Sequence, residues 1–550
     1  MLAIPSKEIG APIPNNTAHA VSVTLPTWEA TVGYEEGEQW VTSKMTSGYP
    51  RFFIHSKIQE LCKHIEEKFG RENEKAWCFP SYEVAKRCRE FVKEKSHCNN
   101  VRILQLRTPP PKTKEEESYR KEAKIAVVFV HDSEWSIAKQ YWQHSGEGIS
   151  SRMGEYVLQE LQISENNLNE DKDKEYKMFI EERFGRNLNL SYVNEAKQIL
   201  KRRIAGTLKD DSDLDSNQRV ICEDDIFLYP TGMASIFNAF LACLNTSTQQ
   251  EGSQLEKSVC FGFPYVDTLN ILKKFGPGVQ FYGFGDDDSL NDLENKLKSG
   301  EKIQSFFCEC PSNPLLKTPN LKKVYELSQI YKFPVVVDET VGNFLNIDVL
   351  PYADIVVSSL TKVFSGDSNV MAGSLVLNPK SQYYEIFTKY FTNNYEDIFW
   401  AEDAIYLERN SRDFQSRSSK VNKTTEAVVN LFQNSSLIKE IFYPKLVPSK
   451  KYYDELKTPH GGYGGLISLV FHNPNAARVF FNEVNLSKGP SLGTNFTLAC
   501  PYAILAHYQE LDEVEKWGVD RNIVRISIGL EDQSELLEIL QHALNLAALE

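Results

Sequence analysis

The chain has 550 residues, of which 41% are apolar, so it is long enough for two or three substantial hydrophobic cores. Its 61 Lys and Arg residues are outnumbered by 75 Asp and Glu residues, and the net charge of −14 argues against a protein that binds the phosphate backbone of nucleic acids. No apolar run approaches the ~20 residues that span a bilayer. We therefore expect neither a nucleic-acid partner nor a membrane partner.

The first residues and the cysteines indicate a cytoplasmic protein. Residues Met1 to Asn16 have no apolar stretch after a basic start, so they do not form a secretory signal. The ten cysteines occur without a C-x-x-C pair and without the histidine spacing that is typical of zinc sites. This distribution favours reduced thiols in the cytosol and predicts no metal site.

Polar segments divide the first 220 residues. Thr108 to Glu122, Ser164 to Lys174 and Leu208 to Gln218 are rich in charged and turn-forming residues, so we predict three solvated loops. The region between about residues 61 and 175 has helical stretches and strand-like ones, such as Ile125 to Val130, but no motif of its own. We predict an amino-terminal arm over residues 1–60 and an extension of unknown role over residues 61–175.

From Val220 onward, short β-rich runs alternate with helical stretches. The expected strands are Ile226 to Tyr229, Ser258 to Gly262, Val279 to Tyr282, Ser305 to Glu309, Pro334 to Val337 and Asp354 to Val357. The expected helices are Met233 to Leu244, Leu290 to Leu297 and Leu321 to Tyr331. This alternation predicts a largely parallel sheet with both faces covered. In such sheets, ligands bind beyond the carboxyl ends of the strands.

Polar residues at the expected strand ends suit one kind of cofactor. Gly232 and Met233 follow a strand and open a helix, whose backbone N–H groups can hold a phosphate. Asp338 closes a buried strand, where its carboxylate needs a cation or a donor such as a pyridinium nitrogen. Lys362 follows the next strand and, partly desolvated there, becomes a nucleophile for a carbonyl cofactor. The hydroxyl groups beside it belong to Ser359 and Thr361.

Motifs at these positions and further along the chain resemble one known family. They are Thr231-Gly232-Met233-Ala234, Glu309-Cys310-Pro311-Ser312-Asn313-Pro314, Val337-Asp338-Glu339-Thr340, Ser359-Leu360-Thr361-Lys362, Ser368-Asn369-Val370-Met371-Ala372-Gly373, Gly464-Gly465, Ser491-Leu492-Gly493 and Arg525-Ile526-Ser527-Ile528-Gly529-Leu530-Glu531. Over about residues 180 to 550, the chain resembles the pyridoxal-phosphate enzymes of cysteine and methionine metabolism, and most of all the long fungal cystathionine gamma-synthases. The resemblance implies an α/β fold of the aspartate-aminotransferase type. We expect a large parallel-sheet domain over residues 176–430 and a smaller carboxyl-terminal α/β domain over residues 431–550.

The resemblance also implies roles for individual residues. Lys362 would bind pyridoxal 5'-phosphate covalently, Asp338 would pair with the pyridine nitrogen, and Asn313 would bond the ring hydroxyl oxygen. Tyr265 would stack on the ring and help to move protons. Arg525 would hold the α-carboxylate of the substrate through a bidentate pair. The remaining assignments are Ser491 to the substrate, and Gly232, Met233, Ser359 and Thr361 to the cofactor phosphate.

One phosphate-binding arginine is open between two positions. In the family, a Tyr-x-Arg element reaches the phosphate of the neighbouring subunit. We favour Arg186, in Phe184-Gly185-Arg186, because this segment precedes Gly232 in the chain as the element does in the family. The second candidate is Arg51, in Tyr49-Pro50-Arg51. Either arrangement requires a second subunit, so we expect a homodimer or a homotetramer.

The resemblance implies γ-replacement of an O-acyl-homoserine by cysteine to give cystathionine, a transsulfuration step of methionine biosynthesis. Cystathionine gamma- or beta-lyase and O-acetylhomoserine sulfhydrylase activities stay open, because those enzymes share the motifs. Pro490 stands before Ser491, where gamma-synthases and gamma-lyases often carry a glutamate. A further alternative is a non-catalytic protein that retains the fold.

Overall fold

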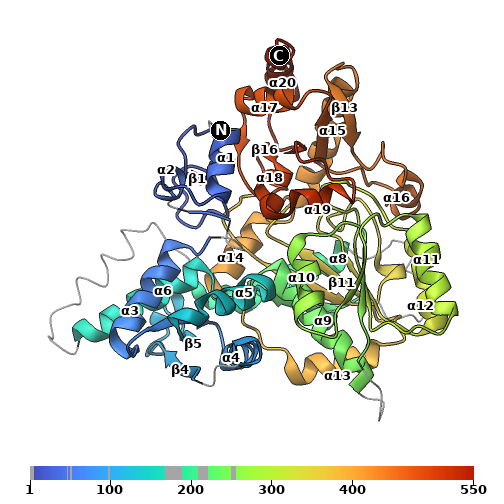
Figure 1. Ribbon diagram of the computed structural model, residues 1–550. Helices are drawn as coiled ribbons and strands as arrows, with labels where there is room; N and C mark the ends of the chain where they lie inside the picture. Colours follow the sequence, from blue (N-terminus) through green and yellow to red (C-terminus); the bar gives the residue numbers. More distant parts are fainter. Residues whose placement is uncertain are drawn as a thin grey trace.

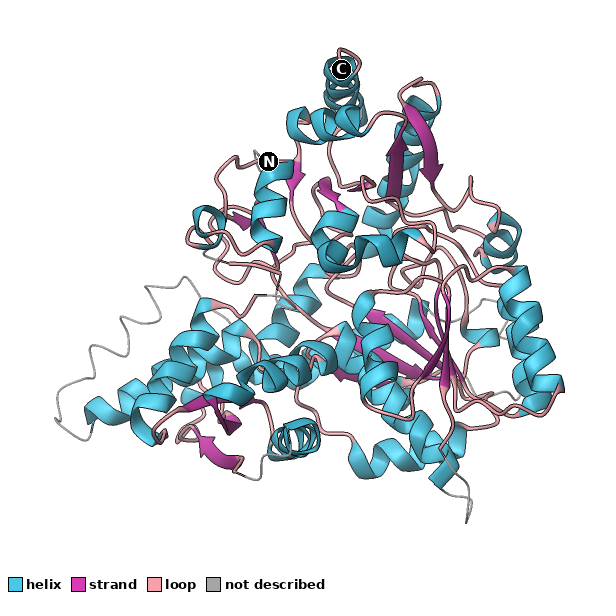
Figure 2. Ribbon diagram, viewed as in Figure 1, coloured by secondary structure: helices cyan, strands magenta, loops and turns pink. Residues whose placement is uncertain are grey.

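A computed structural model describes residues 5–45, 47–49, 53–96, 100–167, 189–207, 221–248 and 255–550 (Figure 1). Four sheets, with helices packed around them, make up this part of the chain (Figure 2). Within the described residues, no helix combines the length and the apolar character needed to cross a bilayer.

The largest sheet has seven strands in the order β6-β12-β11-β10-β9-β7-β8. Their bounds are β6 Ile226–Tyr229, β7 Ser258–Phe261, β8 Val279–Tyr282, β9 Phe306–Glu309, β10 Val335–Asp338, β11 Ile355–Ser359 and β12 Gly373–Leu377. All six predicted strands are confirmed to within two residues at each end. β12, which the sequence analysis did not predict, runs antiparallel to β11 and β6. The α/β fold is confirmed, with one antiparallel strand in the sheet.

Helices cover both faces of this sheet. They include α9 Gly232–Thr248, α10 Val266–Lys274, α11 Asp287–Lys298, α12 Leu321–Tyr331 and α13 Tyr384–Asn394. On β10, Val335 and Val337 contribute to one hydrophobic core, and Val336 contributes to the core on the opposite face. A strand buried on both faces explains the continuous apolar run, because neither set of alternating side chains meets water.

The carboxyl-terminal part of the chain forms a five-stranded sheet in the order β13-β14-β17-β16-β15. Its strands are β13 Ile438–Phe442, β14 Leu466–Phe471, β15 Ser487–Lys488, β16 Leu498–Pro501 and β17 Val524–Ser527. Helices in this part are α14 Ala401–Asn410, α15 Phe414–Gln433, α16 Lys450–Leu456, α17 Pro474–Glu483, α18 Tyr502–His507, α19 Leu511–Glu515 and α20 Gln533–Ala547. Arg525 lies on β17, between two antiparallel neighbours.

The amino-terminal residues form a short arm and a separate α/β unit. The arm contains β1 Pro12–Ile13, β2 Ser22–Val23, α1 Trp28–Glu35 and α2 Gln39–Thr42. The unit has an antiparallel sheet, β3-β5-β4, and four helices: β3 Glu74–Phe79, β4 Arg102–Arg107, β5 Lys124–His131, α3 Ser56–Phe69, α4 Tyr82–Ser96, α5 Trp135–Ser145 and α6 Ser151–Asn167. α5 packs against α9 and α10 of the large sheet (Figure 1).

Of the predicted loops, the structure describes only the beginning of the second and none of the third. α6 continues to Asn167, so the prediction of a loop from Ser164 is wrong for its first four residues, which extend the helix. The rest of that segment, and the segment from Leu208 to Gln218, lie outside the described residues. α8 Val193–Thr207 lies between them.

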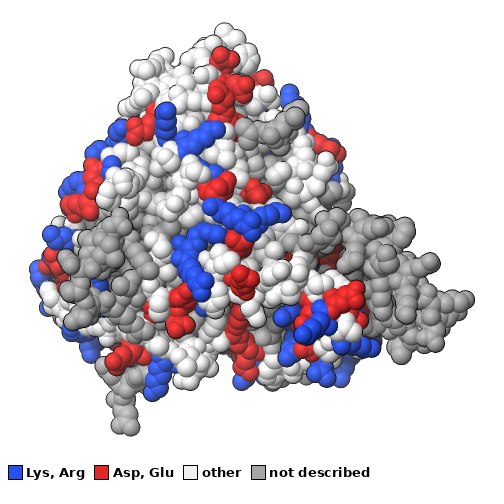
Figure 3. Space-filling model, turned by 180° about the vertical axis from the view of Figure 1, so that it is seen from behind, with Lys and Arg blue, Asp and Glu red and all other residues white. Residues whose placement is uncertain are grey.

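Charged side chains of both signs are mixed on one face of the molecule. On the face shown in Figure 3, basic and acidic side chains lie next to one another, with uncharged residues between them.

Candidate active site

A pocket at the carboxyl ends of β6, β9, β10 and β11 collects the predicted site residues that the structure describes. Its lining includes Gly232, Met233, Tyr265, Asn313, Asp338, Ser359, Thr361, Lys362, Ser491 and Arg525. It also includes three residues to which the sequence analysis gave no role in the pocket: Tyr49, Glu309 and Tyr502. Both candidates for the phosphate-binding arginine, Arg186 and Arg51, lie outside the described residues.

Lys362 is held in the pocket by two hydroxyl groups. Its Nζ donates to Ser491 Oγ at 2.8 Å and to Tyr49 Oη at 3.1 Å. The side chain is only 7% exposed, so its amine is well shielded from bulk water. These contacts aim Nζ at the interior of the pocket from the turn that follows β11.

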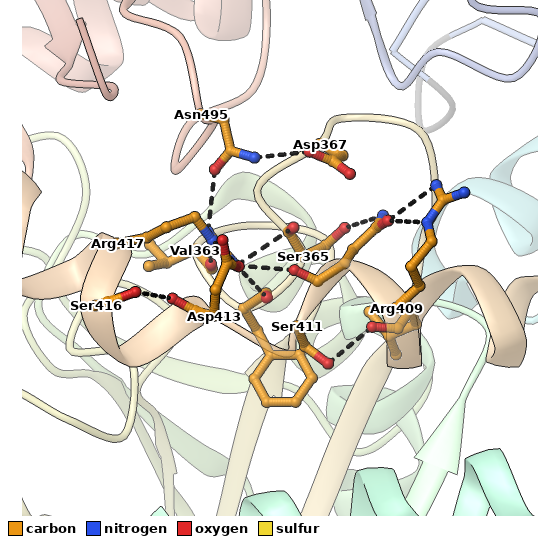
Figure 4. Close-up of polar contacts among 12 residues, drawn as sticks. Val363, Ser365, Asp367, Arg409, Ser411, Asp413, Ser416, Arg417 and Asn495 are labelled. Atoms are coloured by element: carbon orange, nitrogen blue, oxygen red, sulfur yellow. Dashed lines mark hydrogen bonds and ion pairs between the residues drawn. The ribbon is translucent and has the colours of Figure 1, made fainter.

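The backbone after Lys362 is fixed by a buried arginine (Figure 4). Arg417, on α15, donates to the carbonyl oxygens of Val363 and Phe364 at 3.0 and 2.9 Å. It also donates to Asn495 Oδ1 at 3.1 Å, in the loop that carries Ser491. One guanidinium therefore joins the lysine loop to the loop on the other side of the pocket, because its planar fork presents several donors at once.

Asp338 ends β10 with its side chain at the pocket wall. Thr340 donates to Asp338 Oδ1 twice, from its backbone N–H at 2.9 Å and from its hydroxyl at 2.6 Å. Burial raises the pKa of Asp338, and the bonds from Thr340 oppose this shift. Since both bonds use Oδ1, Oδ2 is available to a cationic donor in the pocket, which would stabilise the charged form.

Glu309 is a buried carboxyl beside the half-buried Asp338. The two residues are opposite one another on β9 and β10. Glu309 accepts hydrogen bonds from the backbone N–H groups of Tyr265 at 2.5 Å and Asn313 at 3.2 Å, so it fixes both segments at the pocket. Burial, and then the charge of Asp338, raise the pKa of Glu309 to about 8.

The beginning of α9 makes close contact with the end of β11. A Cβ on Gly232 would lie 2.7 Å from Ser359 Cβ and 3.0 Å from Ser359 Cα. Only glycine permits this approach. The first turn of a helix leaves its backbone N–H groups without helical partners, so those of Gly232 and Met233 can donate to a ligand. These two residues and Ser359 line the same part of the pocket.

The Thr361 hydroxyl, which we expect at the cofactor phosphate, also bonds the backbone of Ala372. Its hydroxyl accepts from the N–H of Ala372 at 3.0 Å and donates to the carbonyl of the same residue at 3.3 Å. This second bond is long and weak, so the hydroxyl hydrogen is available to a stronger acceptor such as a phosphate oxygen.

Arg525 faces the pocket from the carboxyl-terminal sheet. Its Nη1 donates to Asn313 Oδ1 at 3.0 Å, and its Nη2 donates to the carbonyl of Ser491 at 2.6 Å. The guanidinium lies 4.7 Å from the ring centre of Tyr502, whose hydroxyl accepts from Asn313 Nδ2 at 3.2 Å. The Arg525 guanidinium is thereby held on the side of the pocket opposite Gly232, by contacts with Asn313, Ser491 and Tyr502.

The pocket has the donor set of a pyridoxal-phosphate enzyme. A helix start with an adjacent hydroxyl suits a phosphate, a half-buried carboxylate suits a pyridinium nitrogen, and a shielded lysine suits an aldehyde. Residues 221–545 match the model of the Cys/Met metabolism PLP-dependent enzymes. The chain belongs to this family, and its cofactor is pyridoxal phosphate.

The whole chain, including its amino-terminal part, is similar to known fungal proteins. It is 47% identical to a cystathionine gamma-synthase of Saccharomyces cerevisiae over 98% of this chain and 99% of that protein. It is 44% identical to a cystathionine gamma-synthase of Neurospora crassa over 99% of each. Among solved structures, the yeast cystathionine gamma-lyase superimposes with a TM-score of 0.53 and 26% identity, over 64% of this chain and 85% of that one.

The amino-terminal extension, which has no motif of its own, also matches a known family. Residues 57–150 match the family described as the fungal trans-sulfuration enzyme, N-terminal domain. This match covers most of the α/β unit formed by β3-β5-β4 and its helices. We call residues 57–150 the fungal domain below.

Proposed function

We propose that this protein is a cystathionine gamma-synthase, which replaces the γ-acyloxy group of an O-acyl-homoserine by the thiol of cysteine. The observation that carries the proposal is the 47% identity to a protein of that name along the full chain, fungal domain included. The pocket supports the proposal, because it brings together a shielded lysine, Lys362, and a fixed guanidinium, that of Arg525. Gly232 lines the same pocket.

Arg525 would bind the α-carboxylate of the amino-acid substrate. Two of the five guanidinium N–H donors are used by Asn313 and Ser491, which leaves further donors for a carboxylate. The same two bonds prevent the side chain from turning away. Binding at this point orients the α-carbon of the substrate relative to Lys362, and orientation of this kind lowers the barrier of the chemical step.

Lys362 would move the protons. When bound, pyridoxal phosphate supplies an electron sink that labilises bonds at the α-carbon of the substrate. Asp338 would hold the charge of the ring nitrogen through Oδ2. Lys362 Nζ would take the protons from Cα and Cβ, so that the γ-acyloxy group leaves as a carboxylate before the cysteine thiol adds. Ser491 and Tyr49 keep Nζ directed into the pocket for these transfers.

Product analysis tests the proposal. The enzyme is incubated with O-acetylhomoserine or O-succinylhomoserine plus cysteine, and separately with cystathionine alone. We expect cystathionine and the free carboxylic acid from the first reaction. Turnover of cystathionine alone would assign the chain to the lyases, whose fold is that of the solved yeast enzyme. Homocysteine formed from the ester and sulfide, without reaction of cysteine, would assign it to the sulfhydrylases.

We propose further that the active enzyme is at least a dimer, in which an arginine of the partner subunit completes the phosphate site. The support is the family resemblance around Arg186. Mixing Arg186→Ala chains with inactive Lys362→Ala chains should restore activity to some sites, because each mixed site takes its lysine and its arginine from different chains. Arg51→Ala chains should not be rescued in this way, because the neighbouring Tyr49 bonds Lys362 of its own chain. A fully active monomer would contradict this arrangement.

A further inference from the structure

The end of α5 contacts both segments that would hold the cofactor. Residues 144–147, which we call the α5 turn, belong to the fungal domain. They are the last two residues of α5, the helix that packs against α9 and α10, and the two residues that follow it. His144 is hydrogen-bonded to the start of α10, where Tyr265 is the N-cap. Gly146 is hydrogen-bonded to Thr231 at the start of α9, where Gly232 lines the pocket.

The first contact is a chain of two hydrogen bonds through the buried His144. Its Nδ1 lies 2.7 Å from Asp267 Oδ1, and its Nε2 lies 2.9 Å from Lys274 Nζ. An ammonium only donates and a carboxylate only accepts, so the imidazole is neutral and carries its proton on Nδ1. Asp267 is completely buried in the first turn of α10, two residues after Tyr265. The bond from His144 therefore fixes the helix start that aims Tyr265 at the pocket.

The second contact is a backbone carbonyl. Thr231 Oγ1 donates to the carbonyl of Gly146 at 2.9 Å and accepts from the N–H of Ala234 at 3.0 Å. The bond to the Gly146 carbonyl thus sets the rotamer of the Thr231 hydroxyl, which caps α9. Gly146 has a φ of +66°, and a Cβ there would lie 2.3 Å from Thr231 Oγ1 and 2.8 Å from Met233 Cβ. The turn can lie this close to α9 only because it has no side chain at this position.

The α5 turn is itself rigidly attached. Glu147, which is 1% exposed, accepts from Arg87 at 2.7 Å and from Tyr141 at 2.8 Å within the fungal domain. It also accepts from Asn238 on α9 at 3.1 Å. A fully bonded buried carboxylate of this kind has one stable arrangement, because any rotation would leave charge unpaired. The turn therefore acts as a fixed support for both helix starts.

We infer that the fungal domain has a role at the cofactor site, in which His144 and Gly146 are positioning residues that hold the Tyr265 side and the phosphate side of the pocket, respectively. The inference goes beyond the proposed reaction, since it concerns cofactor binding and holds for a synthase, a lyase or a sulfhydrylase alike. It predicts that changes in the α5 turn, which does not line the pocket, alter how the cofactor is held.

The His144 contact is tested by cofactor titration of three full-length variants. His144→Ala removes the donor to Asp267, and His144→Asn restores an N–H near the position of Nδ1. Ser81→Ala is the control, because Ser81 bonds Glu396 across the same interface and far from the turn in sequence. The readouts are the dissociation constant of pyridoxal phosphate and the visible circular dichroism of the bound cofactor, which reports how the ring is held.

We expect His144→Ala to weaken cofactor binding about 10-fold or more and to change the circular dichroism, since a buried bond to a charged group is lost. His144→Asn should recover most of both properties, and Ser81→Ala should match the wild type. Native binding by His144→Ala would overturn the inference. So would an equal loss in Ser81→Ala, which would show only loosened packing of the domain, or a failure of His144→Asn to recover.

The Gly146 contact is tested by comparing pyridoxal phosphate with pyridoxal, which lacks the phosphate. Gly146→Ala should weaken binding of the phosphorylated form and leave pyridoxal nearly unchanged, because its Cβ pushes on the start of α9. Gly37→Ala is the matched control: its φ is +70° and nothing lies within 4 Å of its Cβ, so it introduces the same backbone strain without the contact. Equal losses for the two ligands, or for the two variants, would overturn this part of the inference.

Discussion

Gly232→Ala is expected to displace the start of α9 from the end of β11. The new Cβ would lie 2.7 Å from Ser359 Cβ and 3.0 Å from Ser359 Cα. Carbon atoms in good contact lie about 3.5–4.0 Å apart, so the two segments must separate by roughly 1 Å. Ser359 cannot give way alone, because its Cα belongs to the last residue of a central strand. Overpacking of this kind costs about 1–3 kcal/mol of folding free energy.

The same displacement weakens the phosphate site. A bond of about 2.9 Å from a backbone N–H to a phosphate oxygen is lost when the donor moves by roughly 1 Å. One lost bond to a charged group costs about 1.5–3 kcal/mol, which corresponds to a roughly 10- to 100-fold increase in the dissociation constant. We expect this increase for pyridoxal phosphate, measured by titrating cofactor-free enzyme and following the visible absorbance.

Gly206→Ala provides the control, because nothing lies within 4 Å of its Cβ in α8. It should bind the cofactor as the wild type does and gain up to about 1 kcal/mol of stability from helix propensity. If Gly232→Ala binds pyridoxal phosphate with unchanged affinity and melts at the wild-type temperature, the assignment of this corner to the phosphate is wrong.

Three further outcomes follow from the site. Arg525→Ala should raise the KM for the amino-acid substrate by about 10-fold or more while the cofactor stays bound, and Arg525→Lys should recover only part of this, because an ammonium lacks the guanidinium fork; loss of cofactor from Arg525→Ala would contradict its assignment to the substrate. The pKa of Glu309 is raised from 4.5 to about 8, so the folded, cofactor-free protein binds this proton more tightly than the unfolded chain does. Its stability should therefore fall as the pH rises from 4.5 through 8. In Glu309→Gln the melting temperature should fall less over that range, and an unchanged dependence of melting temperature on pH would refute the role of this carboxyl. By the dimer proposal, Arg186→Ala should weaken cofactor binding more than Arg51→Ala does. Because Tyr49 bonds Lys362 of the same chain, the reverse order would assign the phosphate to Arg51 of the same subunit and contradict the shared site.

The strands of the large sheet could be predicted because each is a short apolar run that ends at a polar residue. Asp338 and Lys362 were recognisable for the same reason, since a charge at the end of a buried strand needs a partner. β12 was missed because no helix separates it from β11. The turn that carries Lys362 returns the chain beside its neighbour, and a direct return of this kind gives an antiparallel strand.

The far wall of the pocket could not be predicted from local patterns. Tyr502 meets Asn313 across 189 positions of sequence, and Tyr49 meets Lys362 across 313. These contacts depend on how the arm and the carboxyl-terminal sheet pack on the large sheet, and no short motif reports that packing. The contacts of the α5 turn could not be predicted for the same reason, because they also join residues far apart in the sequence. The division into domains at residues 60, 175 and 430 stays a prediction.

Borohydride reduction tests the central assignment most directly. Reduction of the enzyme with bound pyridoxal phosphate fixes the cofactor to its lysine as a stable secondary amine, and peptide mass spectrometry then locates it. Because Lys362 is 7% exposed and its Nζ is directed into the pocket by Ser491 and Tyr49, we expect the added mass on the peptide that contains Lys362. Label on any other lysine, or an enzyme that takes up no pyridoxal phosphate at all, would contradict the site described above.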